Sequence, residues 1–251
     1  MPTFNWIGLT VLCLGGYLIT GAANALNQVL EQDVDQKMAR TAKRPLASGR
    51  MTKNQAVLIA GLMSLAGVTL LALFNGLAAL IGMISLMSYA FIYTPMKRVS
   101  PIAVFIGAIP GALPPMIGWV AVTGSIDPEA IVLFALLFAW QFPHFWAIAW
   151  VRFEDYAKAG FYLLPTKKKD KQSALQSLIY ASFLIPIGLM PYIMGLTGVI
   201  SAVIVTGMAF YYTFRAWQLY KSCTRDAARQ LMFSSFIYLP VVMLALVMDK
   251  I

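Results

Sequence analysis

The residues from 27 to 35 combine amide and carboxylate groups at a regular spacing. Asn27, Glu31 and Asp35 follow one another at intervals of four residues, with Asp33 between the last two. On a helix this spacing places the three side chains on one face in successive turns, where the two carboxylates repel each other. A divalent cation would remove the repulsion, because Mg²⁺ is typically held by one or two carboxylates together with substrate phosphates. The simpler alternative is a hydrated helix end whose acids offset nearby cations.

Cations follow these acids within one short segment. Arg40, Lys43 and Arg44 come first, ahead of Pro45 and the sequence Ser48-Gly49-Arg50. A diphosphate binds both Mg²⁺ and the planar guanidinium fork of arginine. Acids next to cations therefore favour a site for Mg²⁺ and a diphosphate over a merely hydrated helix end.

A second group of ionisable residues lies further along the chain. Arg152 and Asp155 follow His144 and Ile148 at spacings that place all four on one face of a continuous helix. His144 would then lie about 12 Å deeper than Arg152. A snorkelling side chain at a helix end is the simple alternative for Arg152. His144 is the only histidine, and a functional role and a helix-packing hydrogen bond are both open for it.

Two further motifs have both a functional and a structural interpretation. The sequence Tyr93-Thr94-Pro95-Met96-Lys97-Arg98 places a basic pair at a helix end, where it could bind an anion or only mark membrane topology. The prolines within residues 109–115 are expected to interrupt a helix at membrane depth. Such kinks are tolerated where a cavity or a neighbouring helix accepts the freed backbone groups.

The elements that must position these residues are membrane helices. Of the 251 residues, 60% are hydrophobic and 12% charged, against about 45–50% and about 25% in soluble domains. This composition excludes a soluble globular domain, a disordered chain and a disulfide scaffold. Eight apolar runs of membrane-spanning length predict an all-α polytopic membrane protein with eight transmembrane helices. The runs are 6–30, 54–73, 77–95, 101–122, 130–151, 173–194, 198–218 and 231–248.

The basic residues divide the loops into two sides. If the odd-numbered loops share one side, that side receives every Lys and Arg except Lys250. Cytoplasmic loops collect Lys and Arg, so we expect the odd loops in the cytoplasm and both ends of the chain outside. The net charge of +9 then reports orientation, and no nucleic-acid partner is expected.

Taken together, these segments resemble the UbiA-type intramembrane prenyltransferases, most closely the heme branch of that family. The resemblance runs from about residue 6 to the C-terminus and implies one domain, 1–251, folded as a UbiA-like bundle. Glu31 stands where the family usually has Asp. The family's second motif is present here as Arg152 and Asp155-Tyr156. It contains fewer acids than in the quinone-type relatives, which argues against a 4-hydroxybenzoate acceptor. The matching stretches are NQVLEQDVDQKMARTAKRPLASGR, YTPMKR, GALPPMIGWVAVTG and PHFWAIAWVRFEDYAKAGFYLLP.

The resemblance also implies a reaction and a set of site residues. A farnesyl group would pass from farnesyl diphosphate to a vinyl group of heme B, giving heme O and releasing diphosphate. The implied catalytic residues are Asn27, Glu31, Asp35 and Asp155, and these with Asp33 are the candidate Mg²⁺ ligands. The implied substrate-binding residues are Arg40, Lys43, Arg44, Lys97, Arg98, Arg152, Tyr156 and His144, with His144 as a heme contact or axial ligand.

The resemblance further implies the protein's surroundings. The partners are heme B, farnesyl diphosphate, the lipid bilayer and a downstream heme-modifying enzyme or oxidase. We expect a bacterial plasma membrane, with the acidic and basic motifs facing the cytoplasm. The family normally has nine helices and the Asn27 motif belongs to its second, so we expect that the first helix is absent here, through truncation or a misplaced start codon.

Two other functions remain open at this point. One is a prenyltransferase with an aromatic or quinone acceptor. The other is a secondary transporter or heme carrier, since kinked helices and intramembrane polar residues also occur there. Carriers usually place ionisable residues near the membrane midplane, between internal repeats. In this sequence the acids and cations crowd at one membrane face and no repeat is visible, so transport is the weaker hypothesis.

Overall fold

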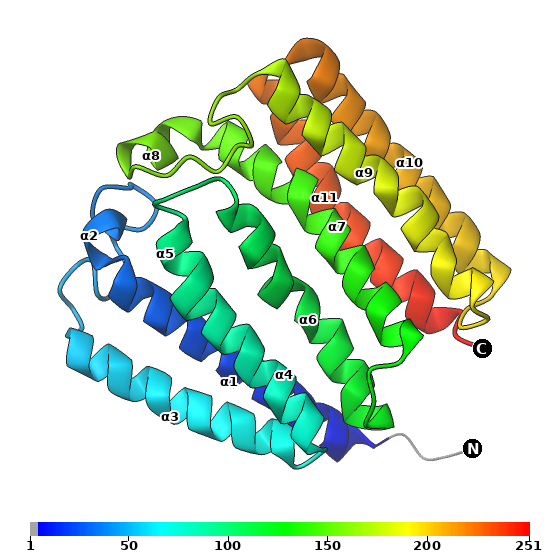
Figure 1. Ribbon diagram of the computed structural model, residues 1–251, viewed down its shortest axis with the longest axis horizontal. Coiled ribbons are helices and arrows are strands. Elements are labelled where there is room, and N and C mark those ends of the chain that lie inside the picture. Colours follow the sequence, from blue (N-terminus) through cyan, green and yellow to red (C-terminus); the bar gives the residue numbers. More distant parts are fainter. Residues whose placement is uncertain (1–4) are drawn as a thin grey trace.

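The chain folds into a bundle of long helices (Figure 1). The computed structural model describes residues 5–251, and in this range eight helical segments are long and apolar enough to cross a membrane. The prediction of an all-α polytopic membrane protein with eight spans is confirmed. The helices are α1 (Trp6–Leu30), α2 (Gln32–Asp35), α3 (Lys53–Ala72), α4 (Gly76–Met87), the π-helix η1 (Ser88–Tyr93), α5 (Thr94–Met96), α6 (Ala103–Thr123), α7 (Pro128–Val151), α8 (Phe153–Lys158), α9 (Lys171–Ile193), α10 (Val199–Ser222) and α11 (Arg225–Met248).

Helix α6 joins two apolar cores. Its first half, with Val104 and Ala108, packs into a core formed with α7, α9, α10 and α11. Its second half, with Ile117 and Val120, packs into a core formed with α1, α3 and α4. Small residues bring the helices close, as expected where lipid supplies no hydrophobic drive between helices. A Cβ atom at Gly67 of α3, for example, would lie 3.1 Å from the Gly15 carbonyl oxygen of α1.

The short helices mark one end of the bundle. Figure 1 shows α2, α5 and α8 together at this end, whereas the first turn of α1 and the C-terminus lie at the opposite end. The loops that sequence analysis placed on one basic side therefore share one end of the molecule.

Two helix boundaries differ from the predicted ones. Helix α7 ends at Val151, and Arg152 leaves helical geometry with φ −103° and ψ 20° before α8 begins. The predicted continuous helical face from His144 to Asp155 is therefore wrong. Helix α11 begins at Arg225, because Cys223 adopts a left-handed turn with φ 49° and Thr224 caps the new helix. The predicted loop 219–230 is thus mostly helical.

The predicted interruption of the helix at residues 109–115 is also wrong. Helix α6 continues through Pro110, Pro114 and Pro115. The Pro114 ring removes the N–H that would bond the Pro110 carbonyl, and the Ser85 hydroxyl donates to that carbonyl instead, at 3.4 Å. Neighbouring side chains can satisfy freed carbonyls in this way, which allows prolines inside membrane helices.

Candidate active site

The Asn27 motif lies where α1 ends. Glu31 interrupts the helix, with φ −112° and ψ 15°. The i to i+4 pattern nevertheless continues across it, because the Glu31 N–H donates to the Asn27 carbonyl at 2.9 Å and the Asp35 N–H donates to the Glu31 carbonyl at 2.8 Å. Asn27, Glu31 and Asp35 are all buried. The three side chains therefore lie on one face as predicted, although the helix is interrupted at Glu31.

The π-helix η1, which follows α4, contacts this motif. In η1 and α5 the backbone N–H of Thr94 donates to the carbonyl of Tyr89, five residues earlier. The Asn27 amide Nδ2 donates to the Thr94 hydroxyl at 3.1 Å and to Glu31 Oε2 at 2.9 Å. Such turns are frequent at functional sites. Sequence analysis missed it, although Pro95, which lacks an N–H, was the available signal.

Each buried carboxylate of the motif has a cationic partner. Lys97 Nζ lies 2.7 Å from Glu31 Oε1, and the two side chains are only 10% and 4% exposed. Arg44 Nη1 lies 2.8 Å from Asp35 Oδ2. Burial lowers the pKa of Lys97 below its usual value, and the negative charge of Glu31 opposes that effect. These pairs hold two acids and two cations next to one another without net charge.

These side chains line a small cavity, here called the polar cavity. Its volume is about 170 Å³. Sequence-predicted site residues supply most of its polar wall: Asn27, Glu31, Asp35, Arg40, Arg44, Lys97 and Tyr156. Tyr89, Tyr93 and Phe161 add aromatic rings to the wall. Lys97 Nζ lies 4.9 Å from the centre of the Tyr93 ring, in a cation–π contact.

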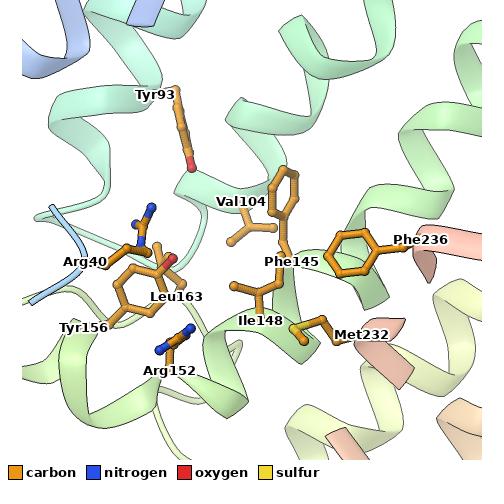
Figure 2. A pocket seen from close by; sticks show the side chains of 10 residues that line it. All are labelled: Arg40, Tyr93, Val104, Phe145, Ile148, Arg152, Tyr156, Leu163, Met232 and Phe236. Carbon is orange, nitrogen blue, oxygen red and sulfur yellow. The ribbon is translucent and has the colours of Figure 1, made fainter. Parts of the chain in front are cut away.

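A larger space, here called the apolar cavity, adjoins the polar cavity. It measures about 390 Å³. Figure 2 shows Phe145 and Ile148 of α7 opposite Met232 and Phe236 of α11, with Val104 of α6 beside them. The two cavities share four wall residues: Arg40, Tyr93, Tyr156 and Leu163. These four residues therefore border both cavities.

Tyr156 carries a phenol at this shared wall. Burial raises its pKa, and the charge of Glu31 adds to the rise, while Arg40 and Arg152 oppose it. The phenol therefore stays neutral and can donate a hydrogen bond at physiological pH.

The structure keeps several sequence-predicted residues away from the polar cavity. Asp33 is exposed and pairs with Arg98 at 2.7 Å. Lys43 is exposed as well. Asp155 lines a separate groove beyond α7, together with Arg152. The helix break at Arg152 explains this separation, because α8 starts a new direction there.

His144 lies beside the apolar cavity and does not line it. It is 8% exposed, and its Nδ1 lies 2.6 Å from the Ser235 hydroxyl of α11. Its ring stacks on Trp140 with the centroids 4.6 Å apart. The neighbouring Phe145 and Phe236 line the cavity in its place. These contacts match the helix-packing alternative for this residue.

The polar cavity offers oxygen ligands for Mg²⁺. Within residues 5–251 no group of three or more His, Cys, Asp and Glu side chains is placed to hold a metal ion by itself. Glu31, Asp35 and the Asn27 amide line the same small space, and Glu31 is held there by Lys97. Two carboxylates and an amide fit Mg²⁺ that arrives with a diphosphate, because that ion takes part of its shell from substrate phosphates.

Sequence comparison identifies the class of protein. Residues 2–239 match the UbiA prenyltransferase family, and the chain belongs to this family. A protoheme IX farnesyltransferase from Cytophaga hutchinsonii is 51% identical over 98% of this chain and 87% of that protein. A protoheme IX farnesyltransferase from Flavobacterium johnsoniae is 45% identical over 98% of this chain and 84% of that protein. The chain is a multi-pass membrane protein, and the alternative of a transporter is not supported.

Solved structures agree with the fold. A structure described for digeranylgeranylglyceryl phosphate synthase superposes with a TM-score of 0.83 at 19% identity, covering 98% of this chain and 87% of that chain. A UbiA homologue from Archaeoglobus fulgidus, bound to GPP and Mg²⁺, gives a TM-score of 0.72 at 14% identity, covering 98% of this chain and 90% of that chain. The prediction of a UbiA-like bundle is confirmed.

Proposed function

We propose that this protein transfers a farnesyl group from farnesyl diphosphate to a vinyl group of heme B, which produces heme O and diphosphate. The observation that carries the proposal is the pair of cavities, one polar and basic, one apolar and larger, with a shared wall. Relatives named protoheme IX farnesyltransferase support the choice of substrates. The sparse second motif favours this acceptor over an aromatic or quinone precursor.

The polar cavity suits the diphosphate of the donor. Arg40 and Arg44 present guanidinium groups and Lys97 an ammonium group to this space, and such cations stabilise a developing phosphate charge. When bound, Mg²⁺ would supply further charge neutralisation for the leaving diphosphate, with Asn27, Glu31 and Asp35 as its protein ligands. The ligation of Mg²⁺ in a UbiA homologue supports this choice of ion.

The shared wall is suited to the reacting carbon. The bond between farnesyl C1 and the diphosphate oxygen breaks, and the vinyl carbon of heme B forms a bond to C1. Water then adds to the remaining cationic carbon and loses a proton, which completes the hydroxyethylfarnesyl group. Tyr93 and Tyr156 place aromatic faces at this wall, where they can stabilise positive charge. The surrounding apolar side chains keep water from the farnesyl cation.

The same proposal includes the location of the protein. By the positive-inside rule the end that carries α2 and α8 faces the cytoplasm, in the plasma membrane of a bacterium. Heme O would leave this site for a heme-modifying enzyme or a heme–copper oxidase.

The deciding experiment offers purified protein two acceptors together with farnesyl diphosphate and identifies the product by mass. We expect heme O from heme B, dependent on Mg²⁺, and no product from 4-hydroxybenzoate. A prenylated 4-hydroxybenzoate would support the aromatic-acceptor alternative instead. Heme uptake into vesicles without diphosphate release would indicate a carrier.

A further inference from the structure

An arginine at the seam between α10 and α11 has no role in the function proposed so far. Arg215 lies in α10, about two turns before this helix ends at Ser222. It lines neither the polar nor the apolar cavity. Its Nη1 donates to the side-chain oxygen of Gln218 at 2.9 Å and to that of Gln230 of α11 at 3.0 Å. The guanidinium group therefore bridges the two helices.

The charge of this guanidinium group is not neutralised by the part of the chain that the structure describes. Arg215 is half-buried, and it forms an ion pair with no residue between 5 and 251. Its Nε is buried and donates no hydrogen bond. The Tyr211 ring, whose centre lies 5.1 Å from the guanidinium carbon, offers only a cation–π contact. Because a half-buried charge without a counter-ion is costly, the seam is suited to an anion.

Arg229 adds a second cation to the seam. It directly precedes Gln230, is exposed, and likewise forms no ion pair with a described residue. The bond from Arg215 to Gln230 fixes the register of the two helices, so the two arginines lie at a similar level of the bundle. Asp226, about one turn nearer the start of α11, pairs with neither of them.

The surroundings of the seam are those of the boundary between lipid tails and headgroups. Figure 1 shows α10 at the outer edge of the bundle. Tyr211 and Phe233, the rings on which the two arginines pack, are 37% and 48% exposed, and Ile237 of α11 is 53% exposed. Aromatic rings next to cations are typical of the membrane interface. A ligand of the seam must therefore combine a negative group with an apolar body that lies in the bilayer.

We propose that the seam binds an anionic phospholipid, whose phosphate is held by Arg215 and Arg229 and whose acyl chains lie along α10 and α11. Phosphate oxygens match the planar fork of a guanidinium group. Basic sites between membrane helices are suited to anionic headgroups for the same reason. The bound lipid supplies the counter-ion that Arg215 lacks. This inference does not depend on the identity of the donor or the acceptor.

The test measures lipid binding to the purified full chain in detergent by native mass spectrometry. The probes are phosphatidylglycerol and phosphatidylcholine with identical acyl chains. Wild-type protein should bind phosphatidylglycerol about 10-fold more tightly than phosphatidylcholine, and Arg215→Gln and Arg229→Gln should each weaken its binding about 5-fold. Phosphatidylglycerol should also raise the Tm of wild type more than that of either variant. If Arg215→Gln does not fold, Arg229→Gln, at an exposed position, decides the question.

Lys221→Gln is the matched control. Lys221 also lies in α10 and also packs on an exposed ring, with its Nζ 4.2 Å from the centre of Trp217, but it points about 120° away from Arg215 around the helix axis. The control loses the same charge and should bind phosphatidylglycerol within about 2-fold of wild type. Equal affinity of wild type for both lipids would overturn the inference, as would an equal loss in all three variants. Displacement of the lipid by inorganic phosphate would also overturn it, because the arginines would then serve a soluble anion.

Discussion

The two cavities are built in different ways. The polar cavity takes its acids from one stretch of nine residues, and each buried acid is already paired, Glu31 with Lys97 and Asp35 with Arg44. The apolar cavity takes its walls from α6, α7 and α11, with Phe145 and Phe236 far apart in the sequence. The polar cavity, which is the donor side of the proposed site, is therefore organised by charge. The apolar cavity, which is the acceptor side, is organised by packing. Substitutions should have larger effects on the donor side, where a charge that loses its partner stays buried.

The most severe test of this contrast is Asp35→Asn. The change removes a candidate Mg²⁺ ligand and leaves the Arg44 guanidinium group without its carboxylate, which is 1% exposed. We expect kcat for heme O formation to fall by about 100-fold or more, while helix content by circular dichroism stays the same. Asp226→Asn, an exposed acid in the first turn of α11, is the matched control and should retain activity.

Asp33→Asn sharpens the same prediction within the motif. Asp33 is exposed, and its hydrogen bond with Arg98 lowers its pKa. Because it does not line the polar cavity, its loss should reduce kcat at least 10-fold less than Asp35→Asn. Equal losses of kcat in the two variants would show that both acids serve the reaction, although only Asp35 lines the polar cavity.

The spacing of four residues explains why this part of the site could be predicted. Backbone bonds from residue 31 to 27 and from 35 to 31 persist through the helix break, so the side chains of Asn27, Glu31 and Asp35 line one cavity. Helix number and class followed from hydropathy for a similar reason, because a bilayer fixes the length of each span. Local periodicity and composition contain this information directly.

The acceptor side could not be predicted in the same way. Its walls depend on how α7 and α11 pack, and no spacing in the sequence places Met232 opposite Ile148. The break at Arg152 also redirected Asp155 to the separate groove beyond α7, and no proline or glycine marks that break. The left-handed turn at Cys223 also has no signal in the sequence, because glycine is the usual residue in that conformation. This turn starts α11 earlier than predicted and places Arg225 at the groove.

Lys97→Met should have the next largest effect, and it tests the buried pair itself. The substitution leaves Glu31 as an unpaired buried carboxylate, which costs about 3–5 kcal/mol of folding stability, and it removes a cation from the diphosphate. We expect a lower Tm and a large loss of kcat. The double variant Lys97→Met, Glu31→Gln should recover Tm and remain poorly active. Recovery of both would mean that the pair serves folding alone.

The pH dependence of the donor side follows from the same lysine. Burial lowers the pKa of Lys97 from its usual 10.5, so the folded protein loses this ammonium charge at a lower pH than an exposed lysine would. As pH rises through the lowered pKa, binding of the diphosphate weakens. The decline in kcat/KM for farnesyl diphosphate should therefore begin at a pH lower than 10.5. In Lys97→Arg the guanidinium group stays charged, so the alkaline decline should move to higher pH. An identical decline in both proteins would assign it to another group.

The smallest effect is expected on the acceptor side, from Met232→Leu. The two side chains have similar volumes, and such exchanges usually cost less than about 1.5 kcal/mol. Met232 lines only the apolar cavity, so KM for heme B should change by about 10-fold or less, with KM for farnesyl diphosphate unchanged. Met190→Leu, at an exposed position of α9, is the control. A larger loss, accompanied by a changed absorbance spectrum of bound heme, would mean that the thioether sulfur binds the iron. The acceptor side would then depend on one specific contact as strongly as the donor side depends on its charges.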